Sequence, residues 1–334
     1  MKIIIPMAGL GKRMRPHTLT VPKPLIPIAG KPIVQRLVED IAKVLSEPVE
    51  EIAYVIGDFG KEVEESLCSI ASDRGITSRV YYQLQPLGTA HAILCAAPSL
   101  SGKVIVAFAD TLFRANFKLE NNCDGVIWVR QVADPSDFGV VKLDKDGVIT
   151  DFIEKPKTFV SDLAIIGIYY FNNGQNLKNE LQYLVDKNIV VNGEYQLTDA
   201  LQNMKNKGMK LRTSQVEEWF DCGNKEATLQ TTKRILELSP PDELILPDAE
   251  IVNSIIIPPC FVGHHARIEN SILGPFVSVG KHTTIKNSIV SDSIIQRYSY
   301  IENIIIHNSI VGNHTEFHGN SSEVNIGDYT SLYR

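Results

Sequence analysis

Short apolar runs alternate with amphipathic stretches along the first 238 residues of the chain. Seven runs have the length and aliphatic content of buried strands, at residues 2–5, 52–56, 79–83, 104–108, 126–132, 148–154 and 165–171. Helices are expected at residues 32–45, 89–97, 174–187, 196–207 and 225–238. This alternation predicts an α/β domain over residues 1–238, with a mainly parallel sheet that has helices on both faces.

A different pattern begins after two prolines in the segment 239–243. Ile251, Ile268, Ile285 and Ile301 each open a copy of the motif Ile-x-Asn-(Ser/Ile)-Ile, at spacings of 17, 17 and 16 residues. One aliphatic residue about every six positions predicts short strands wound into a parallel β-helix of triangular cross-section. Each turn cannot bury its own inner face, so the turns must stack. We therefore expect a second domain over residues 239–334.

Composition excludes several classes of protein. The 334 residues carry a net charge of −6, which argues against a general binder of nucleic acid or of membrane surfaces. No apolar run reaches the roughly 18 residues that a membrane span needs. The five cysteines are scattered and form no Cys-x-x-Cys pair, which favours reduced thiols and a cytoplasmic location.

The charge is unevenly distributed. Residues 240–334 hold 5 basic and 10 acidic side chains, whereas the first 38 residues hold seven basic side chains and no acid. A glycine-rich segment, 9–16, follows the first strand; its backbone amides could approach a phosphate, and Arg13 could neutralise it. Met14 stands where a dinucleotide-binding loop needs glycine, and no Gly-Lys-Ser/Thr of a P-loop follows. A tight turn with surface cations is the structural alternative.

A second basic segment has prolines on both sides of Lys23, which restrict its backbone. Together, Gly-x-Gly-x-Arg-x-x-Pro-x-Thr, Pro-Lys-Pro-Leu-x-Pro and Gly-Lys-Pro resemble the sugar-phosphate nucleotidylyltransferase (nucleotide-sugar pyrophosphorylase) superfamily. The resemblance continues in order through residues 83–90, 108–110, 138–141, 154–156, 166–169, 194–199 and 219–223. It is closest to long-form glucose-1-phosphate thymidylyltransferases. It implies a Rossmann-like sheet and a left-handed β-helix.

The resemblance also implies roles for particular residues. Arg13 would bind the β- and γ-phosphates, Lys23 would bridge the α-phosphate and the sugar phosphate, and Lys155 would hold the sugar phosphate. The implied nucleotide-binding residues are Ala8, Gly9, Gly11, Gln83, Pro86 and Gly88. The implied sugar-binding residues are Gly139, Glu154, Gly167 and Trp219. Asp110 and Asp221 would hold Mg²⁺, which prefers oxygen ligands. His91 is interpreted as a packing or capping residue.

The implied reaction joins a nucleoside triphosphate to a sugar 1-phosphate and releases pyrophosphate. We expect dTTP and glucose 1-phosphate, with UTP or GTP and glucose or mannose 1-phosphate as alternatives. Lys12, Met14, Ala109 and Thr111 depart from the usual family residues and leave the base open. A non-catalytic regulatory or assembly subunit of the same fold is another alternative. Acyl transfer by the tail histidines is a third, although the tail is shorter than in relatives with that activity. Exposed aliphatic residues on the β-helix predict a homo-oligomer.

Overall fold

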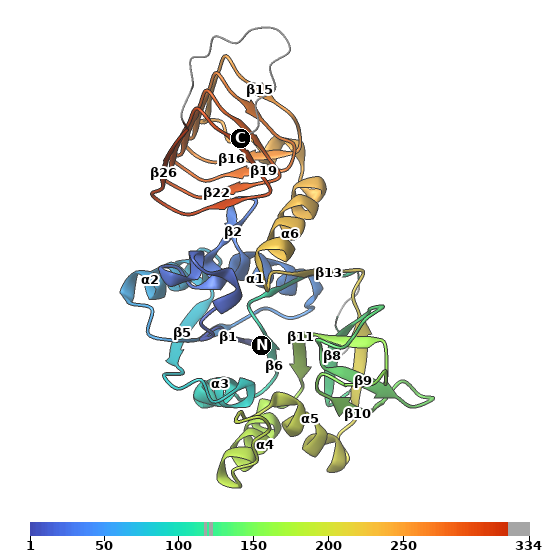
Figure 1. Ribbon diagram of the computed structural model, residues 1–334. Coiled ribbons are helices and arrows are strands. Elements are labelled where there is room, and N and C mark those ends of the chain that lie inside the picture. The colour runs from blue at the N-terminus through green and yellow to red at the C-terminus, as the bar shows by residue number, and fades with distance from the viewer. Residues whose placement is uncertain (117–118, 120–122, 320–334) are drawn as a thin grey trace. The chain divides into compact units, whose positions relative to one another are not determined.

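The computed structural model describes residues 1–116, 119 and 123–319, and the chain separates into two compact units (Figure 1). The first unit comprises residues 1–26 and 31–227, and the second comprises residues 27–30 and 228 onward. The units divide inside helix α6 (Lys225–Leu238), whereas the sequence places the boundary after that helix. The reason is packing, since Leu236 of α6 lies in one apolar cluster with Ala29 and Leu244.

The first unit contains a mixed sheet in the order β10-β9-β11-β6-β1-β4-β5, with β8 paired to β11 and β12. Strands β1, β4, β5 and β6 are parallel, as predicted, but β11 runs antiparallel to β6 and β8. Only residues 144–148 separate β9 from β10, too few for a parallel crossover, so these two pair as a hairpin. The strands are β1 (Lys2–Pro6), β4 (Glu51–Ile56), β5 (Thr77–Tyr82), β6 (Val104–Ala107), β8 (Gly125–Gln131), β9 (Val140–Leu143), β10 (Ile149–Ile153), β11 (Leu163–Phe171) and β12 (Leu211–Gln215).

Amphipathic helices pack against this sheet and bury their apolar positions. They are α1 (Ile33–Val44), α2 (Lys61–Ser72), α3 (Thr89–Cys95), α4 (Gly174–Asp186) and α5 (Leu197–Asn206). The sequence did not predict α2, because Leu67 and Ile70 stand out little among its acidic and small residues. Short 3₁₀ turns complete the unit: η1 (Lys12–Met14), η2 (His17–Leu19), η3 (Lys23–Leu25) and η4 (Ala97–Ser99). Among the described residues, no helix combines the length and apolar character needed to cross a bilayer.

Two further strands of the first unit, β7 (Thr111–Arg114) and β13 (Glu218–Asp221), form a separate antiparallel pair that the sequence did not predict. The short strands β2 (Pro27–Ile28) and β3 (Lys31–Pro32) follow η3 in the chain. The β7–β13 pair joins the end of β6 to the segment that precedes α6.

The second unit is the predicted β-helix, built from three parallel sheets. Ile251, Ile268, Ile285 and Ile301 are in register on successive turns, so the sequence repeat is the turn of the helix. After the turn η5 (Pro241–Glu243) the first sheet is β14 (Glu250–Val252), β17 (Arg267–Glu269), β20 (Thr284–Lys286), β23 (Tyr300–Glu302) and β26 (Glu316–His318). The second is β15 (Ile255–Ile256), β18 (Ile272–Leu273), β21 (Ile289–Ser291) and β24 (Ile305–His307). The third is β16 (Cys260–Val262), β19 (Val277–Val279), β22 (Ile294–Ile295) and β25 (Ile310–Val311).

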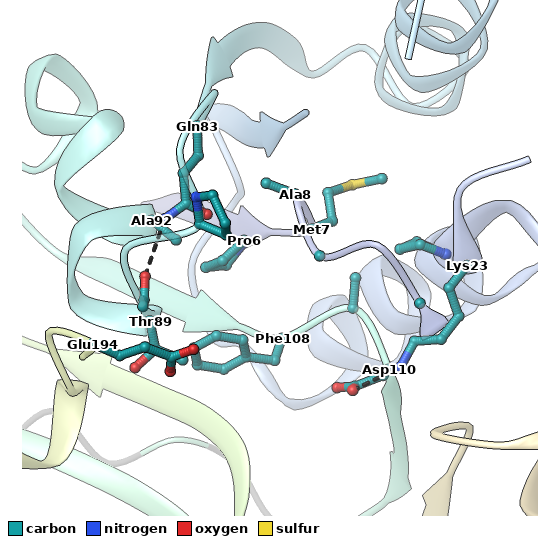
Figure 2. A pocket seen from close by; sticks show the side chains of 16 residues that line it. Pro6, Met7, Ala8, Lys23, Gln83, Thr89, Ala92, Phe108, Asp110 and Glu194 are labelled. Carbon is teal, nitrogen blue, oxygen red and sulfur yellow. Dashed lines mark hydrogen bonds and ion pairs between the residues drawn. The ribbon is translucent and has the colours of Figure 1, made fainter. Parts of the chain in front are cut away.

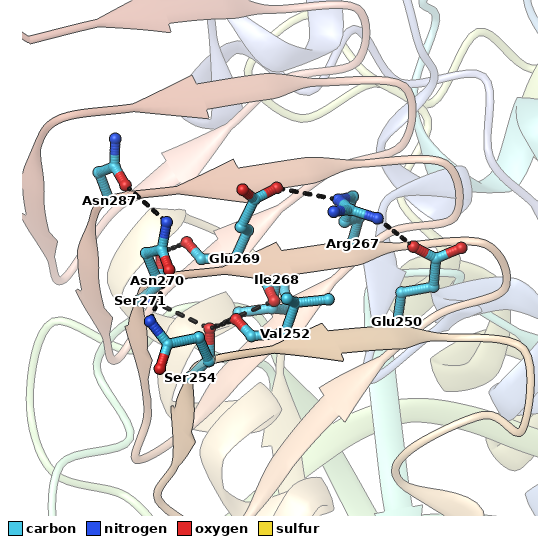
Figure 3. Close-up of polar contacts among 10 residues, drawn as sticks. Glu250, Val252, Ser254, Arg267, Ile268, Glu269, Asn270, Ser271 and Asn287 are labelled. Carbon is cyan, nitrogen blue, oxygen red and sulfur yellow. Dashed lines mark hydrogen bonds and ion pairs between the residues drawn. The ribbon is translucent and has the colours of Figure 1, made fainter.

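Polar ladders at one corner explain the Asn-Ser element of the repeat (Figure 3). Asn253, Asn270 and Asn287 have positive φ values of 46°, 49° and 47°, a conformation that asparagine adopts more readily than most residues. The Asn253 side chain donates to Asn270 at 2.7 Å, and Asn270 donates to Asn287 at 3.3 Å. Beside them, the Ser254 hydroxyl accepts the backbone N–H of Ser271 at 3.0 Å. These hydrogen bonds link polar groups of successive turns at this corner of the β-helix.

Candidate functional site

A cavity of about 280 Å³ opens in the first unit at the carboxyl ends of β1, β5 and β6 (Figure 2). In an open sheet of parallel strands this is where ligands bind. Eight residues that the sequence singled out line it: Ala8, Gly9, Gly11, Lys23, Gln83, Pro86, Gly88 and Asp110. The remaining lining residues are Pro6, Met7, Pro24, Thr89, Ala92, Phe108, Ala109 and Glu194. The predicted residues outside this lining are Arg13, Gly139, Glu154, Lys155, Gly167, Trp219 and Asp221.

The glycine-rich turn lies at one side of the cavity and depends on Gly11. Its φ of 56° lies in the left-handed region, and a Cβ built there would lie 2.9 Å from the Cγ2 of Thr18. The Thr18 hydroxyl donates to the Gly11 carbonyl at 2.8 Å and holds the turn closed. Turn η1, which carries Arg13, begins directly afterwards. The sequence therefore needs glycine here to bring backbone and cation together.

Lys23 reaches the cavity from η3, where the backbone is fixed by proline and by a turn. The Ile26 N–H donates to the Lys23 carbonyl at 3.0 Å. The Lys23 ammonium lies 2.8 Å from a carboxylate oxygen of Asp110, and its side chain is only 13% exposed. The ion pair places one cation and one carboxylate at the same end of the cavity (Figure 2).

The β7–β13 pair brings the two predicted metal ligands together. Asp221 is opposite Thr111 in the ladder, and the Cys222 N–H donates to the Asp110 carbonyl at 2.9 Å. Burial raises the pKa of the Asp221 carboxyl, and the negative charge of Asp110 raises it further. The Gly223 N–H donates to an Asp221 carboxylate oxygen at 2.8 Å and lowers this pKa, as do the charges of Lys23 and Arg13. Asp110 and Asp221 are thus close enough to interact electrostatically.

Gly223 brings Arg13 to the same carboxylate, and the sequence included it in a motif without a role. A Cβ built on Gly223 would lie 2.9 Å from an oxygen of Asp221 and 3.0 Å from a guanidinium nitrogen of Arg13. A larger residue would require the end of at least one of these side chains to shift. Arg13, Lys23, Asp110 and Asp221 therefore form one charged cluster, which we call the four-charge cluster.

These four residues provide two carboxylates, not a complete metal cage. Among the described residues no group of three or more His, Cys, Asp or Glu side chains could hold a metal ion. Mg²⁺ suits such a site, because it commonly takes one or two carboxylates and completes its shell with water and substrate phosphates. The donor set thus fits Mg²⁺ bound together with a triphosphate.

The loop after β5 forms the opposite wall of the cavity. Gly88 has a φ of 104°, and a Cβ built on it would lie 2.5 Å from the carbonyl oxygen of Tyr195. The Tyr195 N–H donates to the Leu87 carbonyl at 2.8 Å. The Thr89 hydroxyl accepts the Leu197 N–H at 3.0 Å. The segment 194–197 therefore fixes the loop that carries Gln83, Pro86 and Gly88 beside the cavity.

The predicted sugar-binding residues lie in two groups. The backbone N–H of Lys155 donates to the carbonyl of Phe138 at 3.2 Å. A Cβ built on Gly139 would lie 3.0 Å from a Glu154 carboxylate oxygen. The Trp219 ring packs edge-on against Phe138, with centroids 4.8 Å apart. In the second group, Gly167 has a φ of 84° and accepts the N–H of Phe108, which lines the cavity.

Asp199 is a polar residue of this region to which the sequence assigned no role. One of its carboxylate oxygens is buried without a hydrogen-bond partner among the described residues, as is the indole nitrogen of Trp219. Burial raises the pKa of Asp199. Desolvation raises the pKa of Glu154 as well, and the charge of Asp199 adds to that rise while Lys155 opposes it. Asp199 and Glu154 therefore lie near each other, and the motif 194–199 was the only signal in the sequence.

The sequence and the fold are both similar to those of known proteins. Residues 2–237 match the Nucleotidyl transferase family, and residues 241–299 match the GlmU-like C-terminal hexapeptide family. The chain is 31% identical over 245 residues to the low-salt glycan biosynthesis nucleotidyltransferase Agl11 of Haloferax volcanii. That match covers 71% of this chain and 66% of Agl11, just under two thirds of the relative.

Two further similarities extend this result. The chain is 30% identical over 287 residues to a glucose-1-phosphate thymidylyltransferase of Streptomyces antibioticus, covering 79% of this chain and 78% of that protein. The solved structure of a UDP-glucose pyrophosphorylase complexed with UDP-glucose matches with a TM-score of 0.58 at 25% identity. It covers 71% of this chain and 99% of the other. The catalytic-domain architecture, and not only a local motif, is therefore shared.

Proposed function

The chain belongs to the nucleotidyl transferase family, and on that premise we propose that it transfers a nucleotidyl group from a nucleoside triphosphate to a sugar 1-phosphate. The observation that carries the proposal is the four-charge cluster, of which Lys23 and Asp110 line the end of the cavity. Such a reaction brings two phosphate anions together, so it needs cations that are already in place. The Lys23 ammonium, held 2.8 Å from Asp110, meets that need.

The reaction is an in-line displacement that uses no covalent protein intermediate. An oxygen of the sugar phosphate forms a bond to the α-phosphorus, and the bond from that phosphorus to the bridging oxygen breaks. The electron pair leaves with pyrophosphate. Catalysis then rests on positioning and on charge stabilisation. Arg13 and the Gly11 turn would bind the β- and γ-phosphates, and Lys23 would bridge the two reacting phosphates.

Asp110 and Asp221 would hold Mg²⁺ beside the triphosphate. When bound, the ion would neutralise phosphate charge and stabilise the pyrophosphate that leaves. Lys155 would pair with the sugar phosphate, and Glu154 would accept hydrogen bonds from sugar hydroxyls. Asp199 is added to these acceptors because of its buried, unpartnered oxygen.

We favour dTTP and glucose 1-phosphate as the substrates. The name of the Streptomyces relative supports this choice. UTP is the main alternative, because the similar solved structure is a UDP-glucose pyrophosphorylase. The test is a matrix of five triphosphates against glucose, mannose and N-acetylglucosamine 1-phosphates, with pyrophosphate release as the readout. Turnover with dTTP and glucose 1-phosphate supports the choice, and greater turnover with another pair replaces it.

We also propose that the protein self-associates through its β-helix. Ile255, Ile272, Ile289 and Ile305 are in register on the outer face of β15, β18, β21 and β24. Ile255, Ile289 and Ile305 are 61%, 42% and 71% exposed. A contiguous uncharged aliphatic column of this kind is typical of an interaction surface, and an isologous contact would pair it with its own copy.

Sedimentation of two variants tests this surface. Ile305→Asp introduces a charge in the column and should shift the protein toward monomer at micromolar concentration. Phe159→Asp is the matched control, since Phe159 is 74% exposed but lies in the first unit. A wild-type protein that is monomeric at the same concentration would contradict the proposal.

A further inference from the structure

The side-chain amide of Gln83 is held by two partners in the wall of the cavity. Its nitrogen donates to the Gly88 carbonyl at 3.1 Å and lies 3.0 Å from Nδ1 of His91. A carbonyl oxygen can only accept, so the atom that faces Gly88 must be the amide nitrogen. Both of its hydrogens are then directed to these partners. The amide oxygen makes no hydrogen bond to the described residues and is the group that remains for a ligand.

This arrangement defines the protonation state of His91. Because the Gln83 nitrogen is a donor, Nδ1 of His91 must carry a lone pair, and the ring hydrogen must be on Nε2. Burial lowers the pKa of His91, which favours this neutral form near neutral pH. Within the part of the chain that the structure describes, the Cys95 sulfur also lies near the ring, but at 3.9 Å from Nδ1 this contact is weak. His91 is thus more than a residue packed on α3.

We propose that His91 is a positioning residue that fixes the Gln83 amide with its oxygen available to the base, so that the site favours thymine or uracil over cytosine. The inference rests on the proposed function. Thymine and uracil carry a hydrogen on ring nitrogen N3, which can donate to a fixed acceptor. Cytosine carries a lone pair there, which such an acceptor repels. Discrimination of this kind is strong when a buried polar group would be left unpaired by the wrong ligand.

The experiment compares kcat/KM for dTTP and dCTP at a saturating sugar 1-phosphate concentration in wild-type protein and three variants. His91→Leu removes the acceptor, so the dTTP to dCTP ratio should fall about tenfold, the value of roughly one hydrogen bond. The loss should be mainly a rise in KM for dTTP, with less change in kcat. His91→Asn can place an oxygen near the position of Nδ1 and should restore most of the ratio. Cys95→Ala is the matched control on the same helix and should leave the ratio unchanged.

A folded His91→Leu variant with an unchanged ratio would overturn the proposal. If that variant does not fold, ¹⁵N NMR of the imidazole in the wild-type protein tests the proposal instead, because it reports the tautomer of His91. An unprotonated Nδ1 supports the proposal, and a hydrogen on Nδ1 overturns it. The NMR result is independent of turnover. A wild-type protein without activity on any triphosphate would therefore contradict the proposed function while the His91–Gln83 contact is still tested.

Discussion

The ammonium of Lys23 lies 2.8 Å from the carboxylate of Asp110, although 87 residues separate them in the chain. Lys23 belongs to a proline-bounded 3₁₀ turn, and Asp110 follows the buried strand β6. The pair is partly buried, and the Lys23 side chain is 13% exposed. Each element fixes one partner independently, so the cation is positioned before any substrate binds. Preorganisation of this kind is what charge stabilisation requires.

Replacing Lys23 by methionine keeps most of the side-chain volume and removes the charge. We expect kcat/KM for pyrophosphate release to fall by about 10²–10³, the cost of losing one preorganised group that stabilises transition-state charge. Lys23→Arg should not restore the rate, because the planar guanidinium is larger and differently shaped. Lys145→Met, at an exposed position in the hairpin turn, should retain wild-type activity. An active Lys23→Met protein would remove this residue from the mechanism.

Asp110→Asn and Asp221→Asn each remove one carboxylate from the four-charge cluster. If both hold Mg²⁺, each variant should need more Mg²⁺ for half-maximal activity and should lose at least about 10²-fold in kcat/KM. The double variant should lose less than the product of the single effects, because the residues act as a unit. The measurement is pyrophosphate release as a function of Mg²⁺ concentration. Asp248→Asn, in the second unit, is the control, and an unchanged Mg²⁺ response in either single variant would be the contrary result.

Gly88→Ala should damage the wall of the cavity that the loop after β5 forms, where the proposed function places the base. The new Cβ would lie 2.5 Å from the carbonyl oxygen of Tyr195, and the φ of 104° is unfavourable for alanine. We expect a rise in KM for the triphosphate of about tenfold or more, with a loss of stability of about 1–3 kcal/mol. Gly75→Ala is the matched control, since Gly75 also has a positive φ of 67° but no atom within 4 Å of its built Cβ. If the two substitutions had equal effects, the loss would come from the backbone conformation alone and not from the contact with Tyr195.

Asp199→Asn should separate stability from sugar binding. Because burial raises the pKa of Asp199, its ionised form opposes folding; the stabilising proton is present at low pH and is lost as the pH rises through the folded-state pKa. The variant should therefore melt at a higher temperature than wild type near pH 8, with a difference that shrinks toward about pH 5. Its KM for sugar 1-phosphate should rise about tenfold.

Thermal unfolding of wild type and variant between about pH 5 and about pH 8, together with the KM of each for sugar 1-phosphate, checks this prediction. Asp73→Asn, an exposed position after α2, is the control and should change neither. A variant that is less stable than wild type near pH 8 would show that the Asp199 carboxylate stabilises the fold.

The β-helix could be predicted in detail because its signal is local and repeated. The spacing of Ile251, Ile268, Ile285 and Ile301 gives the strand register directly. Successive turns stack in the same way, so the same apolar pattern recurs on each turn and is present several times in one chain. The alternating strands and helices of residues 1–238 likewise predicted the parallel half of the sheet, because buried parallel strands are nearly continuous apolar runs.

The parts that the sequence did not predict depend on distant partners. Strands β7 and β13 are short, and each exists because it pairs with the other across about 100 residues of chain. That pairing, and not any local pattern, brings Asp221 to Asp110. His91 is a similar case, since one histidine in a short helix reveals nothing until Gln83 is placed beside Nδ1. The resemblance to a known family assigned roles to residues, but only the tertiary contacts show how the side chains are arranged.

Attack of the sugar phosphate on the α-phosphorus is tested by following the oxygen atoms of one turnover. Wild-type protein is incubated with dTTP, Mg²⁺ and glucose 1-phosphate that carries ¹⁸O in the oxygen between carbon 1 and phosphorus. We expect equal amounts of pyrophosphate and nucleotide sugar, with all of the ¹⁸O in the nucleotide sugar, because the sugar phosphate attacks the α-phosphorus. Loss of that label from the nucleotide sugar, or no product from any pair of triphosphate and sugar 1-phosphate, would contradict it.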